Sequence, residues 1–148
     1  MIPARSGAIV DVRNRQRTHP VNLTLLRQLA RQVAADFQSL SIVLVSDPAM
    51  ARFNLQYHAT AGTTDVLSFG YGDGHGELII SVPRAVAQAR QFRTTPSREL
   101  ALYVVHGILH LQGYDDLTPG PCRRMRAAER RWLRKLDFRE LLPMRSTI

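Results

Sequence analysis

Two histidines and two aspartates fall within the short stretch HGILHLQGYDD, which begins at His106. His106 and His110 are four residues apart, so on a helix both imidazole rings project from the same face. That spacing lets two imidazoles reach one divalent ion. Gly113 ends the predicted helix and turns the chain back, which brings Asp115 or Asp116 toward the same ion. Two histidines and one carboxylate leave a fourth position for water, the open arrangement of a catalytic zinc.

The same histidine pair also has a structural interpretation, because histidines four apart on an apolar helix are usually core residues. Here the pair stands in the last turns of a predicted buried helix, where imidazoles without partners are costly. Both interpretations stay open on the residues alone. One class of enzyme is excluded: HExxH proteases use the glutamate after the first histidine as general base, and Gly107 stands there. His75 and Cys122 are further metal-ligand candidates, although an exposed loop histidine and a buried structural cysteine are the more ordinary readings.

Hydrophobic periodicity and turn signals predict the elements that position these residues. We expect strands at 7–14, 40–46, 65–71 and 77–81, and helices at 20–37, 47–58, 83–92, 95–113 and about 120–136. This order indicates an α/β (α+β) fold with a small mixed four-stranded sheet, packed with about five helices around a central buried helix. We predict one layered domain over residues 1–148, with termini at 1–7 and 143–148 that fray.

The composition is strongly basic, with a net charge of +8, and Lys135 is the one lysine among 20 basic residues. Arginine binds phosphate through a planar donor fork, so this charge favours a nucleic-acid partner, although a genome-wide arginine bias would look the same. The single cysteine excludes an intrachain disulfide and fits a reducing, cytoplasmic location. The N-terminus does not resemble a signal peptide, and no apolar run is long enough to span a bilayer, so we expect no membrane partner.

Several segments together resemble the YbeY family of metal-dependent endoribonucleases. HGILHLQGYDD follows ten of the eleven positions of the family signature HGxLHLxGYDH. Residues 55–69, LQYHATAGTTDVLSF, are similar to the family segment YRxxxxxTDVLSF, and residues 76–81, GELIIS, are similar to its GDIVIS strand. Glu129, with Met125 before it, is similar to the family's last helix. These segments span most of the chain in the family's order.

The resemblance implies a bacterial, zinc-dependent, single-strand-selective endoribonuclease with one zinc per chain. Its implied role is rRNA maturation at the 3′ end of the small-subunit rRNA, together with ribosome quality control. The zinc ligands map onto His106, His110 and Asp116. The implied partners are single-stranded RNA, rRNA and the small ribosomal subunit. The chain carries no DNA-specific motif, and the sequence does not indicate an oligomeric state.

Two positions depart from the family pattern. Asp116 stands where the family has a third histidine. Because aspartate is shorter than histidine, the loop must approach the zinc by about 2–3 Å more to keep the bond. Because aspartate is anionic, a water bound to the zinc is less acidic than with three neutral ligands. Alternatively, Asp116 stays out of contact with the metal and the site is weaker. His58 stands where the family commonly has an arginine that faces the substrate phosphate. We predict a catalytic role for His58, as a protonated phosphate donor or a general acid or base; the alternative is an exposed loop residue.

The last predicted helix is unusually basic, whereas the corresponding helix of the family is often acidic. We predict that Arg130 and Arg134 bind substrate phosphates, with a solvated helix surface as the alternative. Two rival functions remain. One is a ribosome-assembly or RNA-binding factor with a structural or weakened zinc site and little nuclease activity. The other is a zinc hydrolase of a different substrate, which predicts a deep apolar pocket at the histidines.

Overall fold

The helices and strands follow the predicted order closely. A computed structural model of the chain describes residues 7–57 and 65–143. The strands are β1 (Ile9–Asn14), β2 (Ser39–Val45), β3 (Val66–Gly72) and β4 (His75–Ser81). The helices are α1 (Leu23–Val33), α2 (Asp47–Gln56), α3 (Val82–Phe92), α4 (Pro96–Leu111) and α5 (Pro119–Lys135).

The four strands form one mixed sheet in the order β1-β2-β4-β3. β1, β2 and β4 are parallel, and β3 is an edge strand antiparallel to β4. The apolar sequence of β2 is explained by burial on both faces, since side chains alternate along a strand. Leu40, Ile42 and Leu44 belong to the larger core cluster. Val43 and Val45 belong to the cluster on the opposite face, which confirms the predicted α+β class with its mixed sheet.

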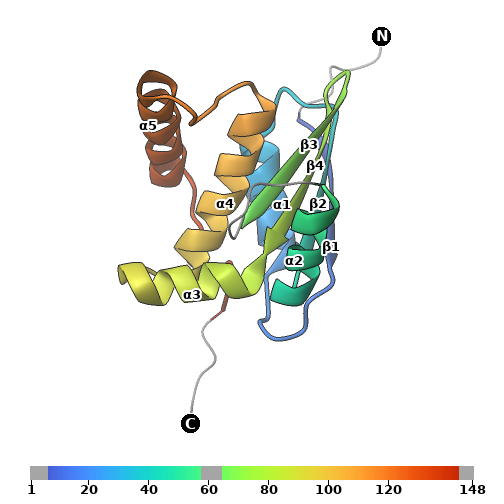
Figure 1. The fold of residues 1–148 in the computed structure, drawn as a ribbon, viewed down its shortest axis with the longest axis vertical. Helices are drawn as coiled ribbons and strands as arrows, with labels where there is room; N and C mark the ends of the chain where they lie inside the picture. The colour runs from blue at the N-terminus through green and yellow to red at the C-terminus, as the bar shows by residue number, and fades with distance from the viewer. Residues whose placement is uncertain (1–6, 58–64, 144–148) are drawn as a thin grey trace.

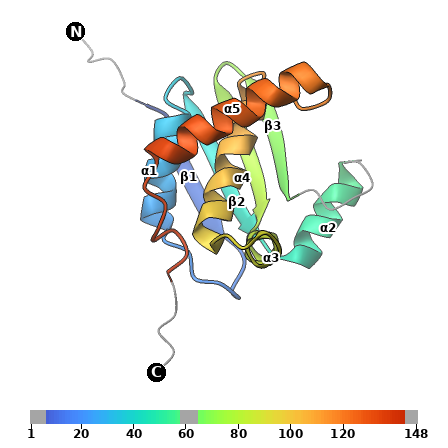
Figure 2. The same ribbon diagram turned by 90° about the vertical axis from the view of Figure 1, so that its left-hand side faces the viewer.

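The helices cover the sheet unequally (Figures 1 and 2). α1 and α4 lie on one face of the sheet, and α5 crosses the outer side of α4. α2 lies on the opposite face, where Met50 and Phe53 pack against the second cluster. α4 contacts α1, α3, α5, β3 and β4, so it is the central buried helix that the sequence predicts. Within the described ranges no helix is long and apolar enough to cross a membrane.

The ends of α4 are fixed by a side-chain cap at Thr95 and by the predicted glycine turn at Gly113. The Thr95 side chain accepts a hydrogen bond from the backbone N–H of Arg98 at 3.1 Å, and Pro96 is the first helical residue. Gly113 follows the helix with a φ of 102°, a left-handed conformation that favours glycine. Its N–H donates to the carbonyl of His110 at 3.1 Å. The helix therefore ends one residue after His110, at Leu111, and the turn that follows sends the chain back toward α5.

The cap of α2 lies one residue before the position that the sequence favours. Asp47 is followed by a proline, a pattern typical of a helix that Asp47 caps. The cap is instead Ser46, whose side chain accepts from the backbone N–H of Ala49 at 3.3 Å. Asp47 lies in the first turn, and its Oδ1 accepts from the hydroxyl of Ser81 at 2.7 Å. Its carboxylate therefore ties α2 to the end of β4.

Gly107 allows α4 to lie close to the sheet, one residue after His106. A Cβ at this position would lie 2.7 Å from Leu78 Cδ2 and 3.0 Å from Val66 Cγ1. Leu78 is fully buried, so it cannot move away freely. The Ser68 hydroxyl also donates to the Gly107 carbonyl across this contact, at 3.2 Å. The glycine that excludes an HExxH motif therefore has a packing role.

We expect Gly107→Ala to destabilise the fold by about 1–2 kcal/mol. Overpacking a core costs about 1–3 kcal/mol, and the better helix propensity of alanine offsets up to about 1 kcal/mol of this. Urea unfolding measures the change. Gly120→Ala in α5 is the control, since a Cβ there meets only Arg124 Nη1 at 3.6 Å. Equal stability of the two variants would contradict the close contact at Gly107.

Candidate metal centre

The C-terminal half of α4 and the loop after it bring His106, His110 and Asp116 together. The two Nε2 atoms of the histidines lie 3.1 Å apart. The distance from His110 Nε2 to Asp116 Oδ1 is 3.9 Å. One potential ligand atom from each of the three residues lies within 4.8 Å of the others. Of the two adjacent aspartates, Asp115 instead accepts a hydrogen bond from the backbone N–H of Leu117 at 3.0 Å, within the loop.

These distances fit the donor set of a divalent ion. Zinc binds imidazole nitrogen at about 2.0–2.1 Å, so two tetrahedral nitrogen ligands lie about 3.3–3.4 Å apart. The 3.1 Å between the histidine nitrogens is close to this spacing. The Asp116 oxygen, at 3.9 Å, is roughly half an ångström beyond it. Asp116 is exposed in a loop, so a small movement of its side chain completes the spacing.

Glu129 holds His106 in the orientation that metal binding needs. Its Oε2 lies 2.7 Å from His106 Nδ1, and the glutamate side chain is only 4% exposed. Because a carboxylate accepts, Nδ1 carries the proton and donates, which leaves Nε2 with its lone pair facing His110. A carboxylate behind a histidine is the arrangement that fixes the tautomer of metal-ligating histidines. From the sequence, Glu129 was identified only through its similarity to the family's last helix. An acidic residue beside the apolar stripe of a basic helix also indicates a buried polar contact.

Local electrostatics favour the neutral form of His110. Its pKa is lowered, first by burial and then by the neighbouring His106 ring. Asp116 and a backbone hydrogen bond with Tyr114 oppose this shift only in part. A lowered pKa keeps the imidazole neutral to lower pH, and the neutral ring is the form that binds a metal.

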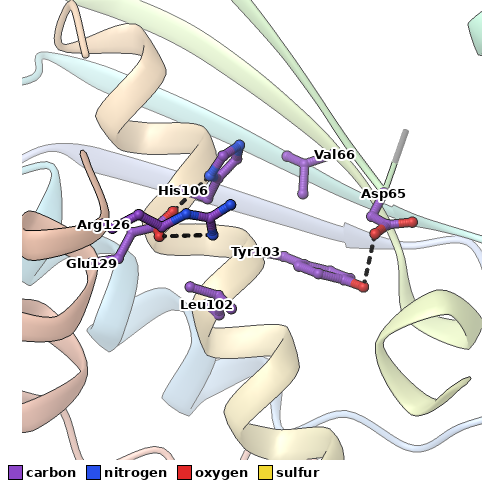
Figure 3. Close-up of a pocket in the computed structure, with 7 residues that line it drawn as sticks. All are labelled: Asp65, Val66, Leu102, Tyr103, His106, Arg126 and Glu129. Atoms are coloured by element: carbon purple, nitrogen blue, oxygen red, sulfur yellow. Dashed lines mark hydrogen bonds and ion pairs between the residues drawn. The ribbon is translucent and has the colours of Figure 1, made fainter. Parts of the chain in front are cut away.

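A cavity of about 200 Å³ lies beside His106 (Figure 3). Its lining comes from α4, α5 and the start of β3: Asp65, Val66, Leu102, Tyr103, His106, Arg126 and Glu129. Asp65 is bound on two sides, because Arg84 Nε donates to Oδ1 and the Tyr103 hydroxyl donates to Oδ2, both at 3.1 Å. Burial, followed by Asp65, raises the pKa of Tyr103 far above its ordinary value, so the hydroxyl stays protonated. This anchoring of Asp65 was missed from the sequence.

The other predicted site residues within the described ranges are not part of this group. His58 lies outside the described residues, so its catalytic role stays a prediction. Arg130 and Arg134 are exposed on α5, and their role in substrate binding also stays a prediction. His75 lies on β4, where its Nδ1 pairs with the Ser39 hydroxyl. Cys122, in the first turn of α5, is half-buried and is not among the residues grouped at the histidines in the described ranges.

Comparisons with known proteins agree with the sequence resemblance. Residues 11–137 match the family model described as Endoribonuclease YbeY. An Endoribonuclease YbeY from Solibacter usitatus is 39% identical over 114 residues, 76% of this chain and 75% of that protein. One from Moorella thermoacetica is 37% identical, over 80% of this chain and 91% of that protein.

A solved structure gives independent support for the fold. The solution structure of TM1509 from Thermotoga maritima is similar with a TM-score of 0.61, covering 86% of this chain and 88% of that chain. At 24% sequence identity this likeness bears on the fold alone. The family model, in contrast, covers most of the sequence, including both histidines and Asp116. The chain therefore belongs to the endoribonuclease YbeY family.

Proposed function

We propose that this protein is a zinc-dependent, single-strand-selective endoribonuclease. In this proposal it acts in the cytoplasm, in rRNA maturation at the 3′ end of the small-subunit rRNA and in ribosome quality control, with one zinc per chain. The observation that carries it is the grouping of His106, His110 and Asp116 at the end of α4, with Glu129 behind His106. Membership of an endoribonuclease family supplies the reaction class.

In this proposal each residue of the group has a separate task. The Nε2 atoms of His106 and His110 hold the ion, and Asp116 adds a carboxylate oxygen and a negative charge. Glu129 keeps the proton of His106 on Nδ1. When bound, zinc supplies Lewis-acid polarisation at a scissile phosphate. Because Asp116 is anionic, the site is less positive than one with three neutral ligands, which favours activity at higher pH.

The charges beside His106 suit a phosphodiester substrate better than an apolar one. The cavity there has Arg126 and Glu129 on one wall and the Arg84-bound Asp65 on another. A hydrolase of apolar substrates would need a deep apolar pocket, and this cavity is small and carries three charged side chains. This composition argues against the hydrolase of an apolar substrate, and the RNA substrate of the proposal rests on the family.

We expect the double variant Arg130→Glu, Arg134→Glu to bind single-stranded RNA more weakly and with a flatter salt dependence. Each lost phosphate contact lowers the slope of log affinity against log salt by about 0.7 for single strands. Affinity measured at several salt concentrations gives this slope. The control is Arg13→Glu with Arg139→Glu, which causes the same change in net charge at exposed sites on β1 and after α5. Equal losses in both double variants would indicate a nonspecific effect of net charge.

One observation favours a second candidate, a ribosome-assembly factor with a structural or weakened zinc. Asp116 is exposed and its oxygen is 3.9 Å from His110 Nε2, beyond the spacing of about 3.3–3.4 Å between tetrahedral zinc ligands. A nuclease assay with chelator-treated and zinc-loaded protein separates the two functions. The proposal predicts cleavage of single-stranded RNA, and not of duplex RNA, only with zinc. The assembly factor would bind zinc and RNA and leave both RNAs intact.

A further inference from the structure

Among the described residues that line the cavity beside His106 is one arginine, Arg126, whose donors are largely available. Arg126 extends from α5 toward the cavity, on the same side as His106 (Figure 3). Its side chain is 59% exposed, and Nη1 lies 3.5 Å from Glu129 Oε1. This contact is a long ion pair, beyond the usual hydrogen-bond distance of about 2.7–3.2 Å. A guanidinium has five N–H donors, so a single long contact leaves most of its capacity for a ligand.

The other charged groups of the cavity are already engaged. Asp65 binds Arg84 and the Tyr103 hydroxyl at 3.1 Å each, so its negative charge is balanced within the protein. Glu129 accepts the proton of His106 Nδ1 at 2.7 Å through its other oxygen. Among the described lining residues, Arg126 is therefore the cation that an entering anion meets, and its guanidinium fork matches the oxygens of a phosphate.

We propose that Arg126 is a substrate-binding residue, which holds a backbone phosphate of single-stranded RNA in the cavity beside His106. This inference rests on the proposed RNA-cleaving function, since His106 is shared by the cavity and the candidate metal group. When one phosphodiester of an RNA strand lies at the histidines, its remaining oxygens or the neighbouring phosphate of the strand lie at this cavity. The apolar walls Val66 and Leu102 then lie beside the attached nucleotide. The nucleotide is held through its backbone, without readout of the base.

The alternative is a purely structural role, in which Arg126 only balances the charge of buried Glu129. The experiment must distinguish this role from RNA binding. The chain offers a matched pair for this purpose. Arg98 Nη1 also lies 3.5 Å from a buried glutamate oxygen, that of Glu99, at the opposite end of α4 from the metal group. Arg98→Gln therefore removes an ion pair of the same length next to a glutamate of similar burial, away from the cavity.

The test compares Arg126→Gln, Arg126→Lys and Arg98→Gln with the wild-type protein. Affinity for a single-stranded oligoribonucleotide is measured by fluorescence anisotropy with chelator-treated protein. Zinc content, kcat and KM are measured with zinc-loaded protein. We expect Arg126→Gln to weaken RNA affinity about tenfold and to raise KM about tenfold. This is the low end of the range for loss of a hydrogen bond to a charged group, because the Arg126 side chain is exposed. Zinc content and kcat change little, and Arg98→Gln binds RNA like the wild type.

The lysine variant covers the case in which Arg126→Gln does not fold. It keeps a positive charge beside Glu129 but lacks the fork, so we expect an intermediate affinity. Wild-type affinity in Arg126→Gln, or in Arg126→Lys where the glutamine variant is unfolded, would overturn the inference. An equal loss in Arg98→Gln would overturn it as well. If wild-type protein with zinc leaves RNA intact, the proposed function fails separately, because the anisotropy measurement needs no cleavage.

Discussion

Replacing both His106 and His110 by alanine is expected to abolish zinc binding and RNA cleavage together. The two Nε2 atoms lie 3.1 Å apart and supply two of the three potential ligands, so the remaining carboxylate of Asp116 cannot hold zinc alone. Zinc bound to the folded state stabilises it by mass action, so the wild-type melting temperature should fall when zinc is chelated. The double variant should melt at one temperature with or without chelator.

Mass spectrometry of zinc per chain and thermal unfolding check this expectation. The control is His75→Ala, which removes a histidine on β4 that pairs with Ser39 outside the metal group. That variant should retain one zinc per chain. Asp116→Ala should retain zinc with weaker affinity, because both imidazoles remain. Full zinc content in the double alanine variant would show that the zinc is held elsewhere.

Replacing Glu129 by alanine is expected to weaken zinc binding by about 10- to 100-fold, although Glu129 is not one of the three candidate ligands. Its Oε2 accepts the His106 Nδ1 proton at 2.7 Å, and without it the ring is free to rotate or change tautomer. Loss of a buried acceptor also destabilises the fold by about 1–3 kcal/mol. In Glu129→Gln the amide oxygen can still accept from Nδ1, so most of the zinc affinity should return.

Competition with a chromogenic chelator measures zinc affinity, and Glu99→Ala is the matched control. Glu99, in the first turn of α4, is about as buried as Glu129 and also pairs with an arginine, Arg98. Its carboxylate accepts a hydrogen bond from the Thr94 hydroxyl and not from a histidine. Its loss should lower stability and leave zinc affinity unchanged. A zinc affinity that falls equally in both alanine variants would indicate general destabilisation, and an unchanged affinity in Glu129→Ala would remove its orienting role.

Much of the fold was predictable because its signals are local. The burial of β2 on both faces and the Thr95 and Gly113 ends of α4 depend on apolar side chains and backbone conformation within a few residues. The histidine pair was predictable for the same reason, since four residues of helix place both rings on one face. The cap of α2 was missed by one residue, because Ser46 and Asp47 are both good caps and tertiary contacts with Ser81 decided between them.

The surroundings of the site could not be predicted in the same way, because they depend on contacts between distant segments. Glu129 reaches His106 across 23 residues, and Asp65 reaches Tyr103 across 38. Such contacts arise from how α5 crosses α4 and where β3 begins. The close approach of α4 to the sheet at Gly107 is likewise a property of packing. The sequence therefore indicated the candidate ligands, while the orienting carboxylate and the cavity required the structure.

The most direct test of the central claim is a zinc titration of RNA cleavage. Chelator-treated protein receives increasing zinc, and the rate of cleavage of a single-stranded oligoribonucleotide is recorded beside that of a duplex. The proposed function predicts no cleavage without zinc, saturation at one zinc per chain, and an intact duplex. The His106→Ala, His110→Ala variant should stay inactive throughout. Cleavage that is independent of zinc, or equal in that double variant, would contradict an active site at His106, His110 and Asp116.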